Sequence, residues 1–373
     1  MSKEFLIIMK EESTHEQFQN VIDTIQQEKS KVILQQAPKL ILGNGTNSFI
    51  DSLNKEKGVY EIFTEEVQDI KSFKLNQNEE LTVNAWNSRQ KPAFMSAKAE
   101  RPQEGESWGF STGCNKPIHN DNELNAVEAA QASASQHMTG LMGVGVIIVD
   151  GPTGSSAAFT PEERNKVITE VQEGTSILAN LAPVNTRLNF TFDIRTVKID
   201  INPNQIRNNF EDESKWRDAA MNKLGYPSDL AGMNKYIEDL RTTILNPVKP
   251  DWGYIAFFIK YPAGHFAYAT LGGPRLVMQY QNDGWGPDNI DRVFAHETGH
   301  IFGAPDEYAQ SGCRIGGQWG QLKVPNNNCE AENSNAVPCL MLGNTSSVCK
   351  WTAGHFGWWD TDGDNIPDVM ERN

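Results

Sequence analysis

A pair of histidines four residues apart constrains this chain more than any other feature of its sequence. His296 and His300 stand in the stretch HETGHIFGAPDEY, and the residues PDNIDRVFAHETGHIF have the apolar spacing of a helix. Positions four apart lie one turn above each other on a helix, so both imidazoles can reach one metal ion. Glu297 stands beside them, where its carboxylate can take a proton from a metal-activated water and later give it to a leaving amine.

The residues around the histidines predict where this helix begins and ends. Either Asp288 or Asn289 can cap its start. Gly303 allows a positive φ at its end, and Pro305 prevents the helix from resuming. The core-facing candidates on the helix are Ile290, Val293, Phe294 and Ile301.

The sharp turn after the helix supplies a candidate for the third metal ligand. A catalytic zinc takes three protein ligands and keeps one position open, whereas the helix provides only two. The turn returns Asp306 toward the metal, so we expect Asp306 to be the third ligand, with Glu307 as the neighbouring competitor. The alternative is that both carboxylates simply follow a helix end on the surface.

The complete pattern, His-Glu-x-x-His-x-x-Gly-x-x-Asp, resembles that of the metzincin metallopeptidases. It matches the variant in which aspartate replaces the third histidine, as in the snapalysin family. The resemblance covers roughly residues 143–359 and implies a zinc-dependent endopeptidase. It also implies that Met341, in VPCLMLGN, lies in the tight turn beneath the zinc, and that a helix follows at CKWTAGHFGWW. The stretch FAYATLGGPRLVMQY would then be the edge strand that binds substrate by strand addition.

The order of expected elements indicates an α/β (α+β) protein. Residues 1–72 read as a small unit of order β-α-β-β-α-β, with Thr14 capping its first helix. This ferredoxin-like order resembles the inhibitory propeptides of secreted proteases, and an unrelated accessory domain is the alternative. Residues 73–142 lack a clear pattern and are expected to form a connection.

Residues 143–359 are expected to form the catalytic domain, a mixed twisted sheet covered by helices and including the active-site helix. GVGVIIVDG reads as a buried strand, and Thr160 with Glu163 forms a capping box for the helix that follows. The strand RLNFTFDIRTVKID and two further helices lead to the strands before the motif. One long strand is expected over FAYATLGGPRLVMQY.

The cysteines suggest an oxidising environment. Of the five, four follow the motif in loops, and the simplest pairing joins Cys313 to Cys329 and Cys339 to Cys349. Three pairings are possible, and reduced thiols are the alternative. Cys114 is then unpaired, and its position upstream of the catalytic domain would suit a cysteine switch that blocks zinc in a zymogen. A free or buried thiol is the competing interpretation.

The C-terminal stretch DTDGDNIPDVMERN predicts a calcium loop, residues 360–373. Its candidate ligands occupy positions 1, 3, 5, 7, 9 and 12 of such a loop: Asp360, Asp362, Asp364, the Ile366 carbonyl, Asp368 and Glu371. Asn365 stands where an EF-hand has glycine, and the loop resembles the Asp-rich loops of thrombospondin type 3 repeats. A solvated acidic tail is the alternative.

Composition limits the partners. The formal net charge of −15 argues against nucleic acid, and no apolar run is long enough to span a bilayer. We therefore expect a secreted monomer acting on protein or peptide substrates with catalytic Zn²⁺ and structural Ca²⁺, although the N-terminus lacks a recognisable signal peptide. The alternatives are a non-catalytic, calcium-stabilised surface protein on a peptidase fold, and a zinc amidase acting on cell-wall peptides. The remaining histidines are expected to be surface or core residues: His15, His119, His137, His265 and His355.

Overall fold

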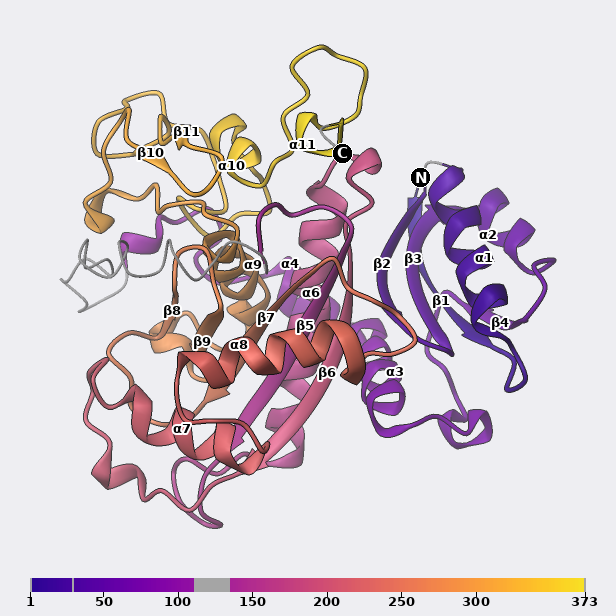
Figure 1. Ribbon diagram of the computed structural model, residues 1–373, viewed down its shortest axis with the longest axis horizontal. Coiled ribbons are helices and arrows are strands. Elements are labelled where there is room, and N and C mark those ends of the chain that lie inside the picture. Colours follow the sequence, from indigo (N-terminus) through magenta and orange to yellow (C-terminus); the bar gives the residue numbers. More distant parts are fainter. Residues whose placement is uncertain (1, 29, 111–134, 372–373) are drawn as a thin grey trace.

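A computed structural model describes residues 2–28, 30–110 and 135–371, so Cys114 and His119 lie outside the described residues. One mixed sheet of nine strands runs through the molecule in the order β4-β1-β3-β2-β6-β5-β7-β9-β8 (Figure 1). The expected α/β class with a mixed sheet is confirmed. The strands are β1 Ser2–Met9, β2 Lys31–Gln36, β3 Leu40–Thr46, β4 Val59–Phe63, β5 Leu141–Asp150, β6 Asn189–Lys198, β7 Trp252–Ile259, β8 Ala267–Ala269 and β9 Arg275–Gln279.

Helices cover both faces of this sheet. They are α1 His15–Gln27, α2 Asn47–Leu53, α3 Gln77–Gln90, α4 Pro92–Ala99, α6 Pro161–Leu181, α7 Glu213–Lys223, α8 Leu230–Asp239, α9 Ile290–Ile301, α10 Lys350–His355 and α11 Asp368–Glu371. A small second sheet pairs β10 Gln318–Trp319 with β11 Val324–Pro325. No helix within the described ranges is both long and apolar enough to cross a membrane.

Strand β5 shows how the sheet separates two cores. Alternate side chains of a strand point to opposite faces. Val144 and Val146 pack in the core that includes Phe294 of α9, whereas Ile147 packs with Trp216 of α7 on the other face. Every residue of β5 is buried, and burial of each of its Leu, Met, Val and Ile side chains contributes about 1.5–3 kcal/mol. Helices α3, α6 and α9 therefore share one face, and α1, α7 and α8 share the other.

The N-terminal unit has the expected order of elements. Its four strands are antiparallel neighbours in the order β4-β1-β3-β2. Helix α1 begins with a capping box in which Thr14 accepts from the Gln17 amide and Gln17 accepts from the Thr14 amide. The ferredoxin-like arrangement predicted for this unit is therefore present.

The N-terminal unit is continuous with the larger sheet. Strand β2 runs parallel to β6, with Leu34 opposite Phe190. The side-chain amide of Gln36 reinforces this contact, since it donates to the Phe192 carbonyl and accepts from the Phe192 amide. The ammonium of Lys31 donates to three carbonyls at the end of α6, those of Ala179, Asn180 and Ala182. The unit thus extends the sheet beyond β6, at the end opposite β8 (Figure 1).

Two predictions for the connections need correction. The region 73–142 contains helices α3 and α4, although a connection was expected. Helix α3 lacks a regular apolar stripe but packs on α6, and Asn76 with Glu79 forms its capping box. The stretch FAYATLGGPRLVMQY forms two antiparallel strands, β8 and β9, in place of one. Gly272 and Gly273 both adopt positive φ, which turns the chain back on itself.

Candidate metal centre

Three ligand atoms converge at the end of α9. The Nε2 atoms of His296 and His300 are 3.1 Å apart, and Asp306 Oδ1 lies 3.1 Å from the first and 3.3 Å from the second. All three side chains are buried, with 2–5% of each residue exposed. A tetrahedral zinc with bonds of about 2.0–2.1 Å needs ligand atoms about 3.3 Å apart. The spacing and the donor chemistry therefore fit a zinc ion.

Backbone carbonyls hold both imidazoles in the tautomer that a metal requires. His296 Nδ1 lies 2.9 Å from the Leu340 carbonyl, and His300 Nδ1 lies 2.7 Å from the Ala304 carbonyl. A carbonyl can only accept, so each Nδ1 carries the proton and each Nε2 presents its lone pair to the centre.

The helix ends in a Schellman motif that brings Asp306 to the histidines. The Ala304 amide donates to the Gly299 carbonyl and the Gly303 amide to the His300 carbonyl, over 3.1 and 2.9 Å. Gly303 has φ +86°, as expected from the sequence. A Cβ on Gly303 would also lie 2.8 Å from the Gly320 Cα, so a second chain segment packs against this turn.

Glu307, the competing candidate ligand, points away from the histidines. Its Oε1 accepts from Thr352 Oγ1 at 2.8 Å and from the Cys349 thiol at 3.0 Å, and its Oε2 accepts from Asn328 at 2.7 Å. Glu307 is 1% exposed, so these contacts satisfy a buried carboxylate. The structure therefore brings Asp306, rather than Glu307, to the two imidazoles.

Met341 lies directly beneath the motif helix. A Cβ placed on Gly299, between the two histidines, would be 2.6 Å from the Met341 Sδ. The Met341 carbonyl also accepts from the Glu307 amide at 2.9 Å. These contacts place Met341 against the helix that carries the two histidines.

Trp108 is a residue of the site that sequence analysis did not identify. Its ring packs edge to face with His296, with centroids 5.5 Å apart. Its indole N–H donates to the Leu340 carbonyl at 2.7 Å, and its amide donates to the Leu342 carbonyl. Ser107 pairs with Gly343 next to it. Ser107 and Trp108 thus pack along the turn that contains Met341.

Glu297 is 4% exposed and lies beside the centre. Burial opposes protonation of His296, but a hydrogen bond from the protonated imidazole to Asp306 and the charge of Glu297 together raise its pKa. The negative carboxylates therefore attract positive charge to this point, whether from a proton or from a metal ion.

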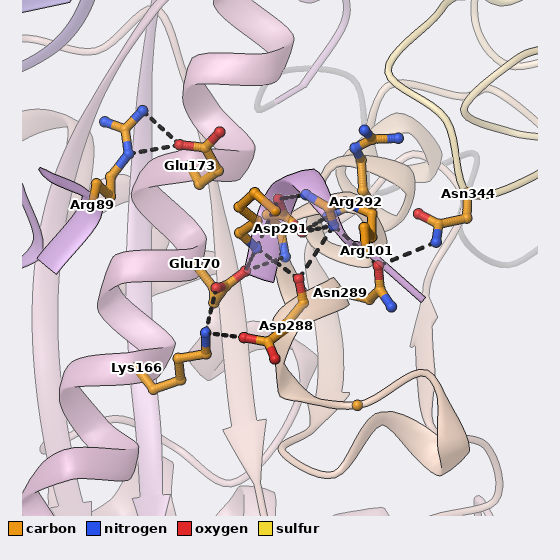
Figure 2. A network of polar contacts seen from close by, with 12 residues as sticks. Arg89, Arg101, Lys166, Glu170, Glu173, Asp288, Asn289, Asp291, Arg292 and Asn344 are labelled. Carbon is orange, nitrogen blue, oxygen red and sulfur yellow. Dashed lines mark hydrogen bonds and ion pairs between the residues drawn. The ribbon is translucent and has the colours of Figure 1, made fainter. Parts of the chain in front are cut away.

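A buried network of charges fixes the start of α9 (Figure 2). Arg101 binds both carboxylate oxygens of Asp291 at 2.6 Å. Lys98 joins Asp291 to Glu170 of α6, at 3.1 and 2.5 Å. Burial, and then the charge of Asp291, raise the pKa of Glu170. Asn289 precedes the helix as expected, but its side chain bonds to Trp285 and does not cap the helix.

The cysteine prediction is half correct. Cys313 and Cys329 form a disulfide with an S–S distance of 2.02 Å. Cys339 and Cys349 are buried free thiols, so the second predicted pairing is wrong for this structure. Each thiol is engaged elsewhere, because Cys339 donates to Thr352 Oγ1 and Cys349 to Glu307 Oε1. With Glu307 they form a second group of ligand atoms within 4.8 Å of one another.

The acidic C-terminal loop brings three of its predicted ligands together. Carboxylate oxygens of Asp360, Asp362 and Asp364 lie within 4.8 Å of one another, and all three residues are exposed. Asp368 instead accepts from the amide and hydroxyl of Thr361. Partial desolvation and then the charges of Asp362 and Asp364 raise the pKa of Glu371. Asn365 has φ +73° at the position where an EF-hand has glycine.

The other described histidines do not join the centre. His15 is exposed, His137 packs on Trp252, and His265 lies against Phe266. His355 is 2% exposed, and neither of its ring nitrogens has a hydrogen-bond partner in the described chain. Burial lowers its pKa to about 4.

No known protein-family profile matches the sequence. No curated protein matches it either.

Proposed function

We propose that this protein is a zinc-dependent endopeptidase whose metal is held by His296, His300 and Asp306. The observation that supports this most is the convergence of two Nε2 atoms and one carboxylate oxygen within 3.1–3.3 Å. Glu297 supports catalysis over a structural metal site, because a structural zinc takes four protein ligands and needs no neighbouring base. The match to the metzincin pattern agrees with this function.

The bound zinc would act as a Lewis acid toward the scissile carbonyl and lower the pKa of a water molecule. Glu297 then takes a proton from the attacking water and gives it to the leaving amine. The Leu340 carbonyl holds His296, the Ala304 carbonyl holds His300, and Met341 packs against Gly299 between them. Asp306 would contribute a negative charge that a third histidine would lack, which would lower the Lewis acidity of a bound zinc.

The substrate is proposed to bind along β8. This strand is last in the sheet order and has a strand neighbour on only one side in the described chain. Helix α9 packs against it, so an extended peptide added to β8 would pass beside the metal ligands. Main-chain hydrogen bonds would hold the peptide, and side-chain contacts would select it.

The N-terminal unit is proposed to be an accessory unit. Its strand β2 pairs with β6, so the unit forms the end of the sheet opposite the proposed substrate strand. An inhibitory propeptide acts by covering the cleft, and this unit does not lie at β8. The zymogen switch predicted for Cys114 stays a prediction, because that residue lies outside the described residues.

The acidic loop is proposed to bind structural calcium. Asp360, Asp362 and Asp364 provide the clustered oxygens, and calcium would relieve their mutual repulsion. Calcium should then raise the melting temperature of wild type and not that of Asp362→Asn combined with Asp364→Asn. Disulfides such as Cys313–Cys329 are typical of secreted proteins, and we propose that this protein is secreted.

The proposed function is tested by zinc content and by cleavage of an unfolded protein. Wild type should contain zinc and cleave the substrate. Glu297→Gln should retain the zinc and lose activity by about 10²–10⁴-fold, the usual contribution of a general base. A zinc-loaded wild type that cleaves no protein would contradict the proposal. Cleavage of cell-wall peptides alone would instead support the amidase alternative.

A further inference from the structure

Arg292 is a buried cation one turn before the first metal ligand. It lies four residues before His296 on α9, so both side chains leave the same face of the helix. Only 8% of the residue is exposed. Buried arginines are normally paired with carboxylates.

The guanidinium of Arg292 has unmet hydrogen-bonding capacity. Within the described residues, neither Nε nor Nη1 has a hydrogen-bond partner. Nη2 lies 3.4 Å from both carboxylate oxygens of Glu104, which is a long contact for an ion pair. Arginine has five N–H donors in a fixed fork, and leaving buried donors unpaired is unfavourable.

The neighbouring acid is already occupied by another arginine. Asp291 is bound through both oxygens by Arg101. Figure 2 shows the Arg292 guanidinium extending away from the cluster around Asp291 and Glu170. Burial, and then the charge of Arg101, lower the pKa of Arg292. Arg101 therefore repels the Arg292 guanidinium, and an anion added beside the unpaired donors of Arg292 would be stabilised.

Glu104 provides the access to this cation. Its side chain is 53% exposed, whereas that of Arg292 is 9% exposed. An exposed glutamate can rotate into solvent at little cost, because surface ion pairs contribute only about 0–1 kcal/mol. Rotation of Glu104 would open Arg292 to a carboxylate from outside.

The position of Arg292 relates it to the reacting bond. Four residues of helix correspond to about 6 Å along the axis, and one extended peptide residue spans about 3.4 Å. A guanidinium one turn from His296 is thus within reach of a side chain one or two residues from the scissile bond. We propose that Arg292 binds the carboxylate of an acidic substrate residue next to the scissile bond, and that Glu104 occupies this site when substrate is absent. This inference rests on the proposed peptidase function.

The test compares peptides that differ only in Glu or Gln at the positions flanking the cleaved bond. For at least one of these positions, zinc-loaded wild type should cleave the Glu peptide with a kcat/KM at least tenfold higher than the Gln peptide. Arg292→Gln should reduce this ratio to about one, because its side chain cannot form a charged fork. Glu104→Gln should lower KM for the Glu peptide, since the internal competitor is lost.

The control variant is Lys55→Gln, which removes one exposed cation from the N-terminal unit and should leave the ratio unchanged. If Arg292→Gln does not fold, Arg292→Lys tests the same point, because it keeps the charge but should lower the ratio. Cleavage of both peptides at equal rates by wild type would overturn the role of Arg292 alone. Failure of wild type to cleave any peptide would instead contradict the proposed function.

Discussion

Trp108 and His296 donate hydrogen bonds to one carbonyl oxygen, that of Leu340, over 2.7 and 2.9 Å. The shared acceptor links Trp108, which precedes β5 in the chain, to a proposed zinc ligand. Trp108→Phe would remove one donor and leave the His296 ring less restrained. We expect zinc affinity to fall about tenfold, the lower end of the effect of losing an outer-shell partner.

The matched control for Trp108 is Trp86→Phe. The indole of Trp86 also donates to a carbonyl, that of Glu65 at 2.9 Å, but it lies on α3 away from the centre. This control should reduce stability and leave zinc affinity unchanged. An equal loss of zinc affinity in both variants, measured by competition with a chelator, would show that Trp108 has no specific role.

The third ligand is tested by a pair of isosteric variants. Asp306→Asn removes the anionic oxygen that faces both imidazoles, so zinc affinity should fall by more than about tenfold. Glu307→Gln changes a carboxylate that bonds to Thr352 and Asn328, so its main effect should be on thermal stability. The reverse pattern in zinc titrations would assign the ligand to Glu307.

Gly303 should tolerate no side chain, for two separate reasons. Its φ of +86° costs about 1–2 kcal/mol for a residue with a Cβ, and that Cβ would lie 2.8 Å from Gly320 Cα. Gly154→Ala is the control, because Gly154 has φ +79° and open space around it. Chemical unfolding should show a greater loss of stability for Gly303→Ala than for the control. Equal losses would mean that the contact with Gly320 is easily relieved.

His355 should make the protein less stable in acid. The unfolded imidazole binds a proton below its usual pKa of 6.5, whereas the folded one, with a pKa of about 4, stays neutral. The contribution of His355 to the free energy of unfolding is therefore complete above pH 6.5. This contribution, up to about 3 kcal/mol, is lost as the pH falls to 4. His355→Leu should show a smaller decrease in stability over this range than wild type. His15→Leu, at an exposed position, should behave as wild type does.

Much of the fold was predictable because local signals agree with the tertiary structure. The capping boxes at Thr14 and Thr160 mark the starts of α1 and α6, and alternating apolar residues mark β6. At the centre, Gly303 and Pro305 required a sharp turn, and the structure has one. These signals depend on neighbours in sequence, which is why they are readable without a structure.

The features that were missed depend on contacts between distant residues. Trp108 lies in a stretch without periodicity, and its role depends on Leu340, far along the chain. Helix α3 has almost no amphipathic pattern, so only the capping box from Asn76 could have indicated it. The sequence allows a disulfide between Cys339 and Cys349, but the buried carboxylate of Glu307 accepts a hydrogen bond from the Cys349 thiol. No pattern in the sequence around Cys349 indicates that a distant carboxylate contacts its thiol.

The most direct test of the central claim is X-ray absorption at the zinc edge, because the chain contains a competing group. Glu307, Cys339 and Cys349 also bring ligand atoms within 4.8 Å of one another. Zinc held by His296, His300 and Asp306 should show only nitrogen and oxygen neighbours, at about 2.0–2.2 Å. A sulfur shell at about 2.3 Å would place the metal at the two cysteines and contradict the proposed active site.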